Sequence, residues 1–351
     1  MKYWSDLVSS IKPYIPGEQP QDGGYIKLNT NENPFPPSSA VIAAIARACN
    51  ELRLYPPPMA DELRDQIARY FGIKPEMVFV GNGSDEILAF CYPAFFVGKA
   101  PILFNDITYS FYEVYSELFS VKYRKVPLEA DFNIVGAAFT PPNGGIIIAN
   151  PNAPTGVALS LGEVEAIVAN NRESVIVVDE AYIDFGGESA IPLLTTYENL
   201  VIVQTLSKSR SLAGLRVGFA LANPQLIQAL ARIKDSFNSY TLDRLAIAGA
   251  KASFEDEEYF ARTRREIIAI REQTASALRQ LGFVVLPSKA NFLFASHSQM
   301  AAKELYEKLK GVGILIRYFN KPRIDNHVRI SIGTAQDMRD LVVALRLIIG
   351  A

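Results

Sequence analysis

Residues 145–179 read GIIIANPNAPTGVALSLGEVEAIVANNRESVIVVD, and this stretch decides the fold class. It opens on GIIIA and closes on VIVVD, two short apolar runs that predict buried β-strands. Between them, Ser160 and Glu163 form a capping box, which predicts a helix over 160–171. A strand, a helix and a second strand in this order are typical of an α/β protein with a largely parallel sheet.

The same alternation extends to both sides of this stretch. Further strands are predicted at 77–80, 101–104 and 200–205, and an amphipathic helix is predicted over 60–71. We therefore expect a large domain over 31–242, with a mostly parallel central sheet flanked by helices.

The pattern changes near residue 240. Residues 243–281 are charged and helix-prone, which indicates one long helix or two helices in series. The shorter elements that follow predict a smaller α+β domain over 243–351. The first thirty residues are rich in Pro and Gly and predict an N-terminal arm, 1–30. The elements expected in the smaller domain are strands at 282–286, 290–295, 314–317 and 328–332 and helices at 299–310 and 335–349.

Composition narrows the choice of partners. The 351 residues carry 35 basic and 37 acidic side chains, a formal net charge of −2. Such a surface is not drawn to nucleic acid or to an anionic membrane, so a small-molecule partner is expected. Two cysteines and two histidines, without CxxC or HxxxH spacing, predict neither a disulfide framework nor a metal site. No apolar h-region follows a basic n-region at the start, so a cytoplasmic location is predicted.

Two ionisable residues stand where predicted buried strands end. Lys208 follows the run 200–205 among small hydroxyl residues, at the strand end where α/β sheets meet ligands. A lysine that loses solvation there can form a Schiff base, and an ordinary surface lysine is the alternative. Asp179 ends the run 175–179, where a buried carboxylate needs a partner such as a protonated pyridine nitrogen. A helix-capping role for Asp179 is the alternative.

Two glycine-containing turns also follow predicted strands. The turn GNGSDE (81–86) begins a helix whose free N–H groups could receive a phosphate. A dinucleotide fingerprint would require glycine where Glu86 stands, and no GxxxxGK[ST] motif occurs. The loop NPNAPTG (150–156) is stiffened by two prolines, as a loop that holds a ring requires. Taken singly, each turn is equally compatible with a plain structural turn.

Together and in this order, these motifs resemble those of the fold-type I pyridoxal-phosphate (PLP) aminotransferases, and the resemblance covers essentially the whole chain. In particular, the chain resembles the histidinol-phosphate aminotransferase subfamily. The motifs that carry the resemblance are KPYIPG (12–17), LNTNENPFPPS (28–38), LYPPP (54–58), GNGSDE (81–86), TYSFY (108–112), NPNAPTG (150–156), VVDEAY (177–182), TLSKSRSLAGLRVG (205–218) and VRISIGT (328–334).

The resemblance implies roles for the residues that match the family's motifs. Lys208 would hold PLP covalently and act as general base and then acid. Asp179 would keep the pyridine nitrogen protonated, and Tyr182 would donate to the ring's 3-oxygen. The family's ring-contacting asparagine is matched by Ala153, so Asn152, one position earlier, is the candidate for that contact. Further cofactor contacts are implied for Gly83, Ser84, Asp85, Tyr109, Ser207 and Arg216, and for Tyr55 of a neighbouring subunit, which implies a homodimer.

The substrate side follows from the same resemblance. Arg329 matches the arginine that grips a substrate carboxylate, and it would face the phosphate of histidinol phosphate. Tyr14, Asn31 and Arg317 match substrate-side positions, where a surface or packing role is the alternative. The implied reaction converts histidinol phosphate and 2-oxoglutarate to imidazole-acetol phosphate and glutamate, in histidine biosynthesis. An aromatic aminotransferase or a threonine-phosphate decarboxylase on the same scaffold is the alternative.

Overall fold

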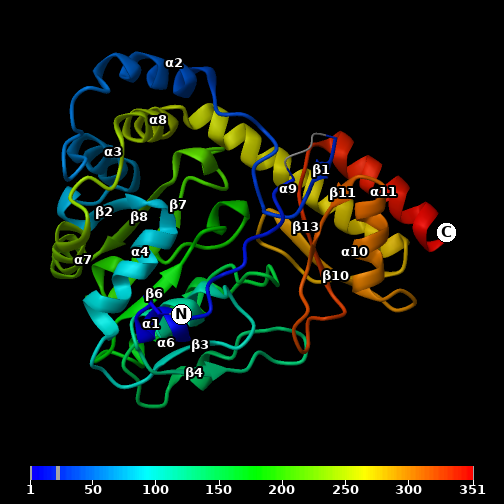
Figure 1. The fold of residues 1–351 in the computed structure, drawn as a ribbon, viewed down its shortest axis with the longest axis horizontal. Coiled ribbons are helices and arrows are strands. Elements are labelled where there is room, and N and C mark those ends of the chain that lie inside the picture. The colour runs from blue at the N-terminus through cyan, green and yellow to red at the C-terminus, as the bar shows by residue number, and fades with distance from the viewer. Residues whose placement is uncertain (1, 21–23, 351) are drawn as a thin grey trace.

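A long helix joins two α/β units in the computed structural model, which describes residues 2–20 and 24–350 (Figure 1). The first unit contains a seven-stranded sheet with the order β2-β8-β7-β6-β5-β3-β4. β8 is antiparallel to both of its neighbours, and the other neighbouring strands pair in parallel, as the sequence predicted. The strands are β2 (Val78–Asn82), β3 (Ile102–Asn105), β4 (Tyr123–Val126), β5 (Ile146–Ala149), β6 (Ile176–Asp179), β7 (Leu200–Thr205) and β8 (Val217–Ala222).

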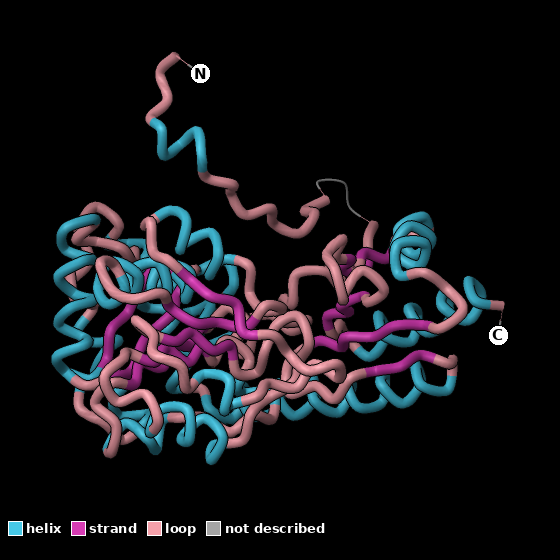
Figure 2. Tube along the Cα trace, turned by 90° about the horizontal axis from the view of Figure 1, so that it is seen from below, coloured by secondary structure: helices cyan, strands magenta, loops and turns pink. Residues whose placement is uncertain are grey.

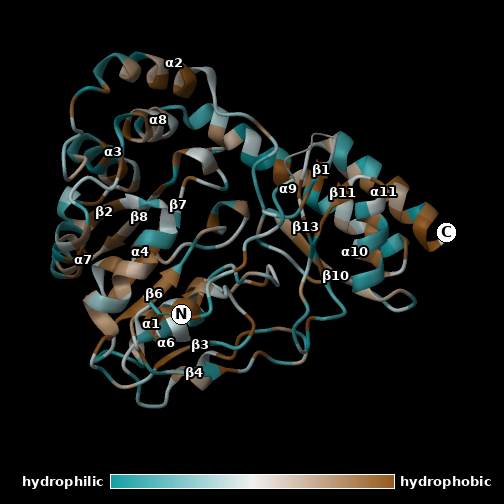
Figure 3. Cartoon of the chain, viewed as in Figure 1, coloured by the Kyte–Doolittle hydropathy of each residue, from teal (hydrophilic) through white to brown (hydrophobic). Residues whose placement is uncertain are grey.

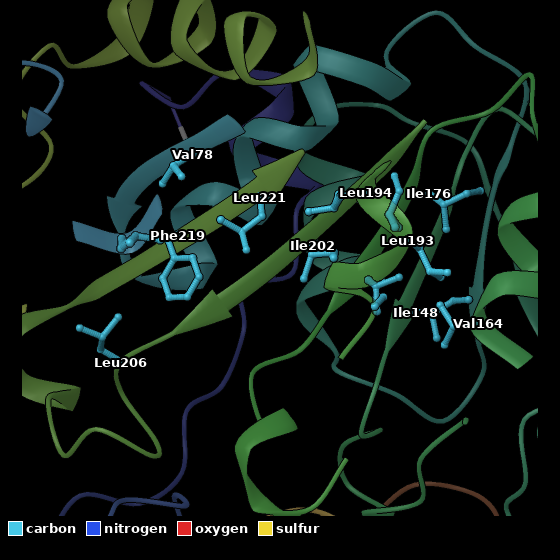
Figure 4. Close-up of a cluster of buried hydrophobic side chains, with 14 of the residues drawn as sticks. Val78, Ile148, Val164, Ile176, Leu193, Leu194, Ile202, Leu206, Phe219 and Leu221 are labelled. Atoms are coloured by element: carbon cyan, nitrogen blue, oxygen red, sulfur yellow. The ribbon is translucent and has the colours of Figure 1, made fainter. Parts of the chain in front are cut away.

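Helices cover both faces of this sheet, because the strands supply alternate apolar residues to each face. Ile147 and Val177 pack on one face, whereas Ile148 and Ile176 pack on the other against Val164 (Figure 4). The hydropathy colouring shows the same apolar strands between more polar helix surfaces (Figure 3). The face of Val164 is covered by α2 (Ser39–Ala48), α3 (Asp61–Phe71), α6 (Leu161–Ala169) and α8 (Arg244–Glu255), and the opposite face by α4 (Gly83–Cys91), α5 (Phe111–Leu118) and α7 (Pro224–Phe237).

The second unit is built on a four-stranded antiparallel sheet with the order β12-β13-β10-β9. A separate short pair joins β1 to β11 in parallel, so residues 26–28, assigned to the arm from the sequence, lie against this unit. Its elements are β1 (Ile26–Lys27), α9 (Glu257–Gln280), β9 (Phe283–Val285), β10 (Phe292–His297), α10 (Ala302–Gly311), β11 (Ile314–Leu315), β12 (Arg317–Tyr318), β13 (Val328–Ser331) and α11 (Ala335–Ile349).

The stretch predicted as one helix or two is two helices in series. α8 ends at Glu255, and α9 begins at Glu257 after the capping residue Asp256, whose side chain accepts from the Tyr259 backbone N–H. Ala246 and Phe254 of α8 belong to the core of the first unit, whereas α9 packs on the second sheet. The core of the first unit therefore extends beyond residue 242.

Where the structure describes it, the start of the N-terminal arm is not packed into either unit. Its helix α1 (Asp6–Ser10) contains no buried residue, and the arm stands away from the body in Figure 2. Trp4 is 51% exposed and Tyr3 is 90% exposed. Among the helices of the described residues, none is long and apolar enough to cross a membrane.

Candidate active site

The predicted site residues gather at one edge of the seven-stranded sheet, where the parallel strands end. The loop 150–156 follows β5, Asp179 ends β6, and Lys208 lies three residues after β7. Tyr109 lies four residues after β3, in the segment that leads into α5. Ligand sites of α/β sheets form at this carboxyl edge, because loops from several neighbouring strands meet there.

Lys208 is half-buried, and its Nζ donates to the Thr30 carbonyl at 3.1 Å. The Nζ also lies 5.9 Å from the centre of the Tyr182 ring. The backbone of the lysine loop is held by Asn33, whose Nδ2 donates to the carbonyls of Lys208 and Ser209 at 2.9 and 3.1 Å. The amine is therefore held at a defined position by a neutral carbonyl.

Asp179 is 5% exposed and accepts a hydrogen bond from the Tyr112 hydroxyl at 2.7 Å and another from the Ala181 N–H at 3.2 Å. Burial raises the pKa of this carboxyl to about 6, against the effect of these two hydrogen bonds. Within residues 2–20 and 24–350, no lysine or arginine forms an ion pair with it. A buried carboxylate without a cation is poised to receive one from a ligand.

The turn 81–86 forms a small cradle with Arg216. Arg216 Nη2 lies 3.0 Å from Asp85 Oδ2, and its Nη1 donates to Ser207 Oγ at 3.3 Å. Tyr109 donates to Asp85 Oδ1 at 2.8 Å, so the Asp85 carboxylate is already occupied on both oxygens. Gly83 begins α4 at φ +77°, and a Cβ there would lie 2.4 Å from Arg216 Nη2. The cradle therefore requires glycine and offers the helix N-terminus and a guanidinium to an anion.

Gly218, the last residue of the motif 205–218, has a packing role that its sequence context did not indicate. A Cβ on Gly218 would lie 2.5 Å from the backbone N of Ser84. β8 therefore passes directly beneath the start of α4, and only glycine permits so close an approach. Tyr112 was also missed, although its partner Asp179 was predicted.

Asn152 is fully buried, and its side-chain amide forms hydrogen bonds with neighbouring residues of the protein. Its Nδ2 donates to the Ile107 carbonyl at 2.9 Å and to Thr155 Oγ1 at 3.1 Å, and its Oδ1 accepts from Thr108 Oγ1 at 2.8 Å. These bonds tie the loop 150–156 to the segment that carries Tyr109. The amide stabilises the loops around the site, and both of its N–H groups are engaged there.

The second unit faces this edge with two arginines. Arg329 on β13 donates through Nη2 to the Asn29 carbonyl at 3.0 Å, while its buried Nε has no hydrogen-bond partner among the residues that the structure describes. Burial lowers the pKa of Arg329. Arg317 on β12 donates to the carbonyls of Ile15 and Pro16 in the arm at 3.3 and 3.4 Å. An unsatisfied buried guanidinium N–H indicates a place for an anionic ligand.

Tyr14 brings the arm over the same edge. Its ring stacks on Phe111 with a centroid distance of 4.3 Å and meets Tyr109 edge-on at 6.3 Å. Burial raises the pKa of Tyr14, and the charges of Arg317 and Arg329 act in the opposite direction. Tyr14 therefore lies between the anion cradle of the first unit and the arginines of the second.

Tyr55 lies apart from this cluster. It is 77% exposed, stacks on Tyr240 at 4.7 Å, and forms no hydrogen bond or aromatic contact with the cradle residues in the described part of the chain. The strap 54–58 that carries it is held by two cations. Arg244 donates to the Leu54 and Tyr55 carbonyls at 2.9 and 2.8 Å, and buried Lys234 donates to the Pro58 carbonyl at 2.9 Å.

Comparison with solved structures identifies the class of proteins that share this fold. The structure of histidinol-phosphate aminotransferase from Sinorhizobium meliloti, in complex with pyridoxal-5'-phosphate, superposes with a TM-score of 0.90. It covers 100% of this chain and 98% of that chain at 24% identity. Aspartate aminotransferase from Thermus thermophilus with maleate superposes with a TM-score of 0.84, at 19% identity and with 99% of this chain and 100% of that one covered. The two-unit fold is that of the aminotransferases.

Sequence relatives narrow this class to a family. The family model for aminotransferase class I and II matches residues 24–345. Histidinol-phosphate aminotransferase from Clostridium acetobutylicum is 53% identical over 97% of this chain and 97% of its own length. The protein of the same name from Acinetobacter baumannii is 54% identical over 99% and 97%. The chain belongs to the class I and II aminotransferase family, which confirms the resemblance found in the sequence, and it is an enzyme of that class.

Proposed function

We propose that the protein transfers an amino group between histidinol phosphate and 2-oxoglutarate, with PLP as cofactor, in histidine biosynthesis. One observation carries the cofactor assignment: Asp179 is a buried carboxylate without a cationic partner in the described part of the chain, at the sheet edge that also holds Lys208. The choice of substrate is supported by the relatives named histidinol-phosphate aminotransferase at 53% and 54% identity over nearly the whole chain.

The residues present fit PLP. A protonated pyridine nitrogen would supply the cation that Asp179 lacks, and the cradle at Gly83, which a single Cβ would fill, suits the phosphate. Asp85 would contribute its backbone N–H only, since its carboxylate is engaged by Arg216 and Tyr109. We assign the phosphate contacts to Gly83, Ser84, Asp85, Ser207 and Arg216, the ring contacts to Asp179, Tyr182 and Tyr109, and the covalent attachment to Lys208. The proposed role of Asn152 is to hold the loop beside the ring.

When bound, PLP supplies an electron sink for the electron pair left on the substrate's Cα. The chain's own residues supply the proton transfer and the binding. The Lys208 amine removes the proton from Cα, and the Thr30 carbonyl, 3.1 Å from its Nζ, holds the amine beside the site. Arg329 binds the anionic end of the substrate through the guanidinium edge that includes the unsatisfied Nε.

The same pocket would receive both substrates in turn. Histidinol phosphate has no α-carboxylate, so its phosphate would occupy the place that a carboxylate of glutamate or 2-oxoglutarate takes at Arg329. Arg317 on β12 and Tyr14 on the arm would lie on the substrate side of this site, where Arg317 donates to the arm and Tyr14 stacks on Phe111. A cytoplasmic location is part of the proposal, because Cys49 and Cys91 are free thiols and disulfides persist mainly in oxidising compartments.

The site is proposed to be completed across a homodimer by Tyr55 of the partner subunit. The support is that Tyr55, on the strap that Arg244 and Lys234 hold, is exposed and stacks on the half-exposed ring of Tyr240. Phe237, at the end of α7 and three residues before Tyr240, is a further exposed aromatic residue; its side chain is 80% exposed. Exposed aromatic groups of this kind mark protein interfaces.

The function is tested by a half-reaction assay. PLP absorbance is followed while histidinol phosphate, phenylalanine or threonine phosphate is added in separate experiments. We expect conversion with histidinol phosphate at a much higher kcat/KM than with phenylalanine, and borohydride reduction followed by peptide mapping should label Lys208. Preference for phenylalanine, release of CO2 from threonine phosphate, or a label on another lysine would contradict the proposal.

The dimeric site is tested by mixing Tyr55→Phe and Lys208→Ala proteins. If Tyr55 acts across the interface, the mixed dimer has one intact site and one site with both lesions. Its Lys208-bearing site should then retain PLP as well as the unmodified enzyme does. Retention as poor as in the Tyr55→Phe homodimer, or an active monomer in sedimentation, would refute the role of Tyr55 in the partner's site.

A further inference from the structure

Within the described residues, the hydroxyl of Tyr182 accepts a hydrogen bond and donates none. Asn31 Nδ2 donates to it at 2.9 Å. Among residues 2–20 and 24–350, no hydrogen bond donated by this hydroxyl is found, although the ring packs edge-on against Phe292 at 5.1 Å. A phenol oxygen that accepts a hydrogen bond from an amide N–H must direct its own O–H elsewhere. The direction of the Tyr182 O–H bond is therefore set by Asn31.

Asn31 can play this part only because its own amide is oriented by Ser331. The Asn31 backbone N–H donates to Ser331 Oγ at 2.8 Å, and the Ser331 hydroxyl donates to Asn31 Oδ1 at 2.8 Å. With Oδ1 used in this way, Nδ2 is the atom that faces Tyr182. Asn31 is fixed in the left-handed region at φ 57°, which asparagine tolerates, and Asn291 Nδ2 donates to its carbonyl at 3.0 Å.

We propose that Ser331 and Asn31 are positioning residues that make the Tyr182 hydroxyl a hydrogen-bond donor toward the 3-oxygen of the PLP ring. The inference rests on the proposed function, because it needs PLP at this edge of the sheet. It assigns Asn31 to Tyr182 rather than to the substrate, and it gives Ser331 a role that no motif suggested. Both residues are buried, so the pair is shielded from solvent.

The same segment links this pair to the substrate side. Ser331 and Arg329 are two residues apart on β13 and so share one face of the strand. Arg329 donates to the Asn29 carbonyl, Lys208 to the Thr30 carbonyl, and Ser331 engages Asn31. Three consecutive residues, 29–31, thus contact the anion-binding arginine, the reactive lysine and the orienting serine. A shift of β13 would be passed directly to the Tyr182 hydroxyl.

The experiment compares Ser331→Ala and Asn31→Gly, each in the Tyr182 protein and in a Tyr182→Phe background. The first readout is the pH midpoint of the absorbance change of lysine-bound PLP, and the second is the dissociation constant of PLP. A donor at the ring's 3-oxygen weakens the hold of that oxygen on the proton of the neighbouring lysine nitrogen, so loss of the donor raises the midpoint. The matched control is Ser288→Ala. Like Ser331, Ser288 uses its Oγ to accept a hydrogen bond from a backbone N–H, that of Ala290, and its hydroxyl donates to an oxygen, the Phe292 carbonyl.

In the Tyr182 protein, we expect both variants to raise the midpoint by about one pH unit, the effect of one hydrogen bond to a charged group. In the Tyr182→Phe background the two changes should have no further effect on the midpoint, because they act through the hydroxyl. Ser288→Ala should leave the midpoint unchanged. If Ser331→Ala does not fold, Asn31→Gly alone decides, because glycine tolerates the positive φ of Asn31, removes the amide and adds no charge.

Equal shifts in both backgrounds would overturn the inference, because the residues would then act without the phenol. An unchanged midpoint in the Tyr182 protein would overturn it too. Failure of the proposed function gives a different result: the unmodified protein would then show no PLP absorbance band at all.

Discussion

Replacing Asp179 with asparagine is expected to stabilise the cofactor-free protein near neutral pH while it removes activity. Burial raises the pKa of Asp179 to about 6, about two pH units above the ordinary value of about 4. Each pH unit corresponds to about 1.4 kcal/mol, so the ionised carboxylate lowers the free energy of unfolding by about 3 kcal/mol at pH 7. Asparagine carries no charge and can still accept the hydrogen bond from Tyr112.

The sign of the pH dependence follows from proton binding. Because the pKa of Asp179 is raised in the folded protein, the folded state holds this proton over a range of pH in which the unfolded chain has lost it. The favourable contribution is fully present below about pH 4 and is lost as the pH rises to about 6. Above that pH the cost of the buried charge is constant. The asparagine variant has no such cost at any pH.

Urea denaturation of the PLP-free proteins measures this difference. Between about pH 4.5 and about pH 7.5, the stability advantage of Asp179→Asn over the unmodified protein should grow by about 2 kcal/mol. The matched control is Asp65→Asn in α3, an exposed position whose effect should be the same at both pH values. The reasoning is refuted if the advantage of Asp179→Asn does not change with pH, or if the variant is the less stable protein at pH 7.5. With PLP added, its half-reaction rate should fall by several orders of magnitude, because a neutral amide does not keep the pyridine nitrogen protonated.

Three further changes test other parts of the site. Gly83→Ala should weaken PLP binding, because its Cβ would lie 2.4 Å from Arg216 Nη2 and the positive φ would add about 1 to 3 kcal/mol of strain. Equilibrium titration measures the affinity, and an unchanged affinity would argue against the cradle. Arg329→Lys should raise KM for both substrates by about tenfold through loss of bidentate binding, and steady-state kinetics that show only one KM affected would separate the two substrate sites. Lys234→Met keeps the length of the side chain but leaves the Pro58 and Ser239 carbonyls without their donor, so the unfolding free energy should drop by about 2 kcal/mol. Hydrogen exchange should at the same time increase near residue 58, and exchange that stays unchanged would show that Lys234 does not hold the strap.

The parts of the fold that local patterns determine were predicted from the sequence. The runs at 145–149 and 175–179 are strands β5 and β6, and the Ser160–Glu163 capping box begins α6, because burial on both faces and helix capping are properties of short segments. β8 was missed. Its sequence VGFALA carries a glycine and two alanines, and its place between β7 and β2 is set by antiparallel pairing with a strand far away in the chain.

The same distinction holds for the site. Residues such as Lys208 and Asp179 stand directly after apolar runs, so their place at the sheet edge could be predicted. The hydrogen bonds of Asn31 to Tyr182 and Ser331 join residues 151 and 300 positions apart, and no local pattern reports such contacts. The hydrogen bonds of the Asn152 side chain likewise could not be predicted from the sequence, because they depend on how two loops pack together. The role of Tyr55 stays a prediction, since it concerns a second subunit.

The pairing of β2 with β8 has a consequence for how the enzyme is made. Val78 pairs with Leu221, and Gly218 lies against the turn at Ser84, so the two sides of the anion cradle come from distant points of the chain. At a synthesis rate of about 5 to 20 residues per second, residue 218 leaves the ribosome on the order of 10 s after residue 84. During that interval the nascent chain exposes the unpaired edge of β2 and has no complete phosphate cradle. The phosphate cradle can therefore be complete only after residue 218 has been synthesised.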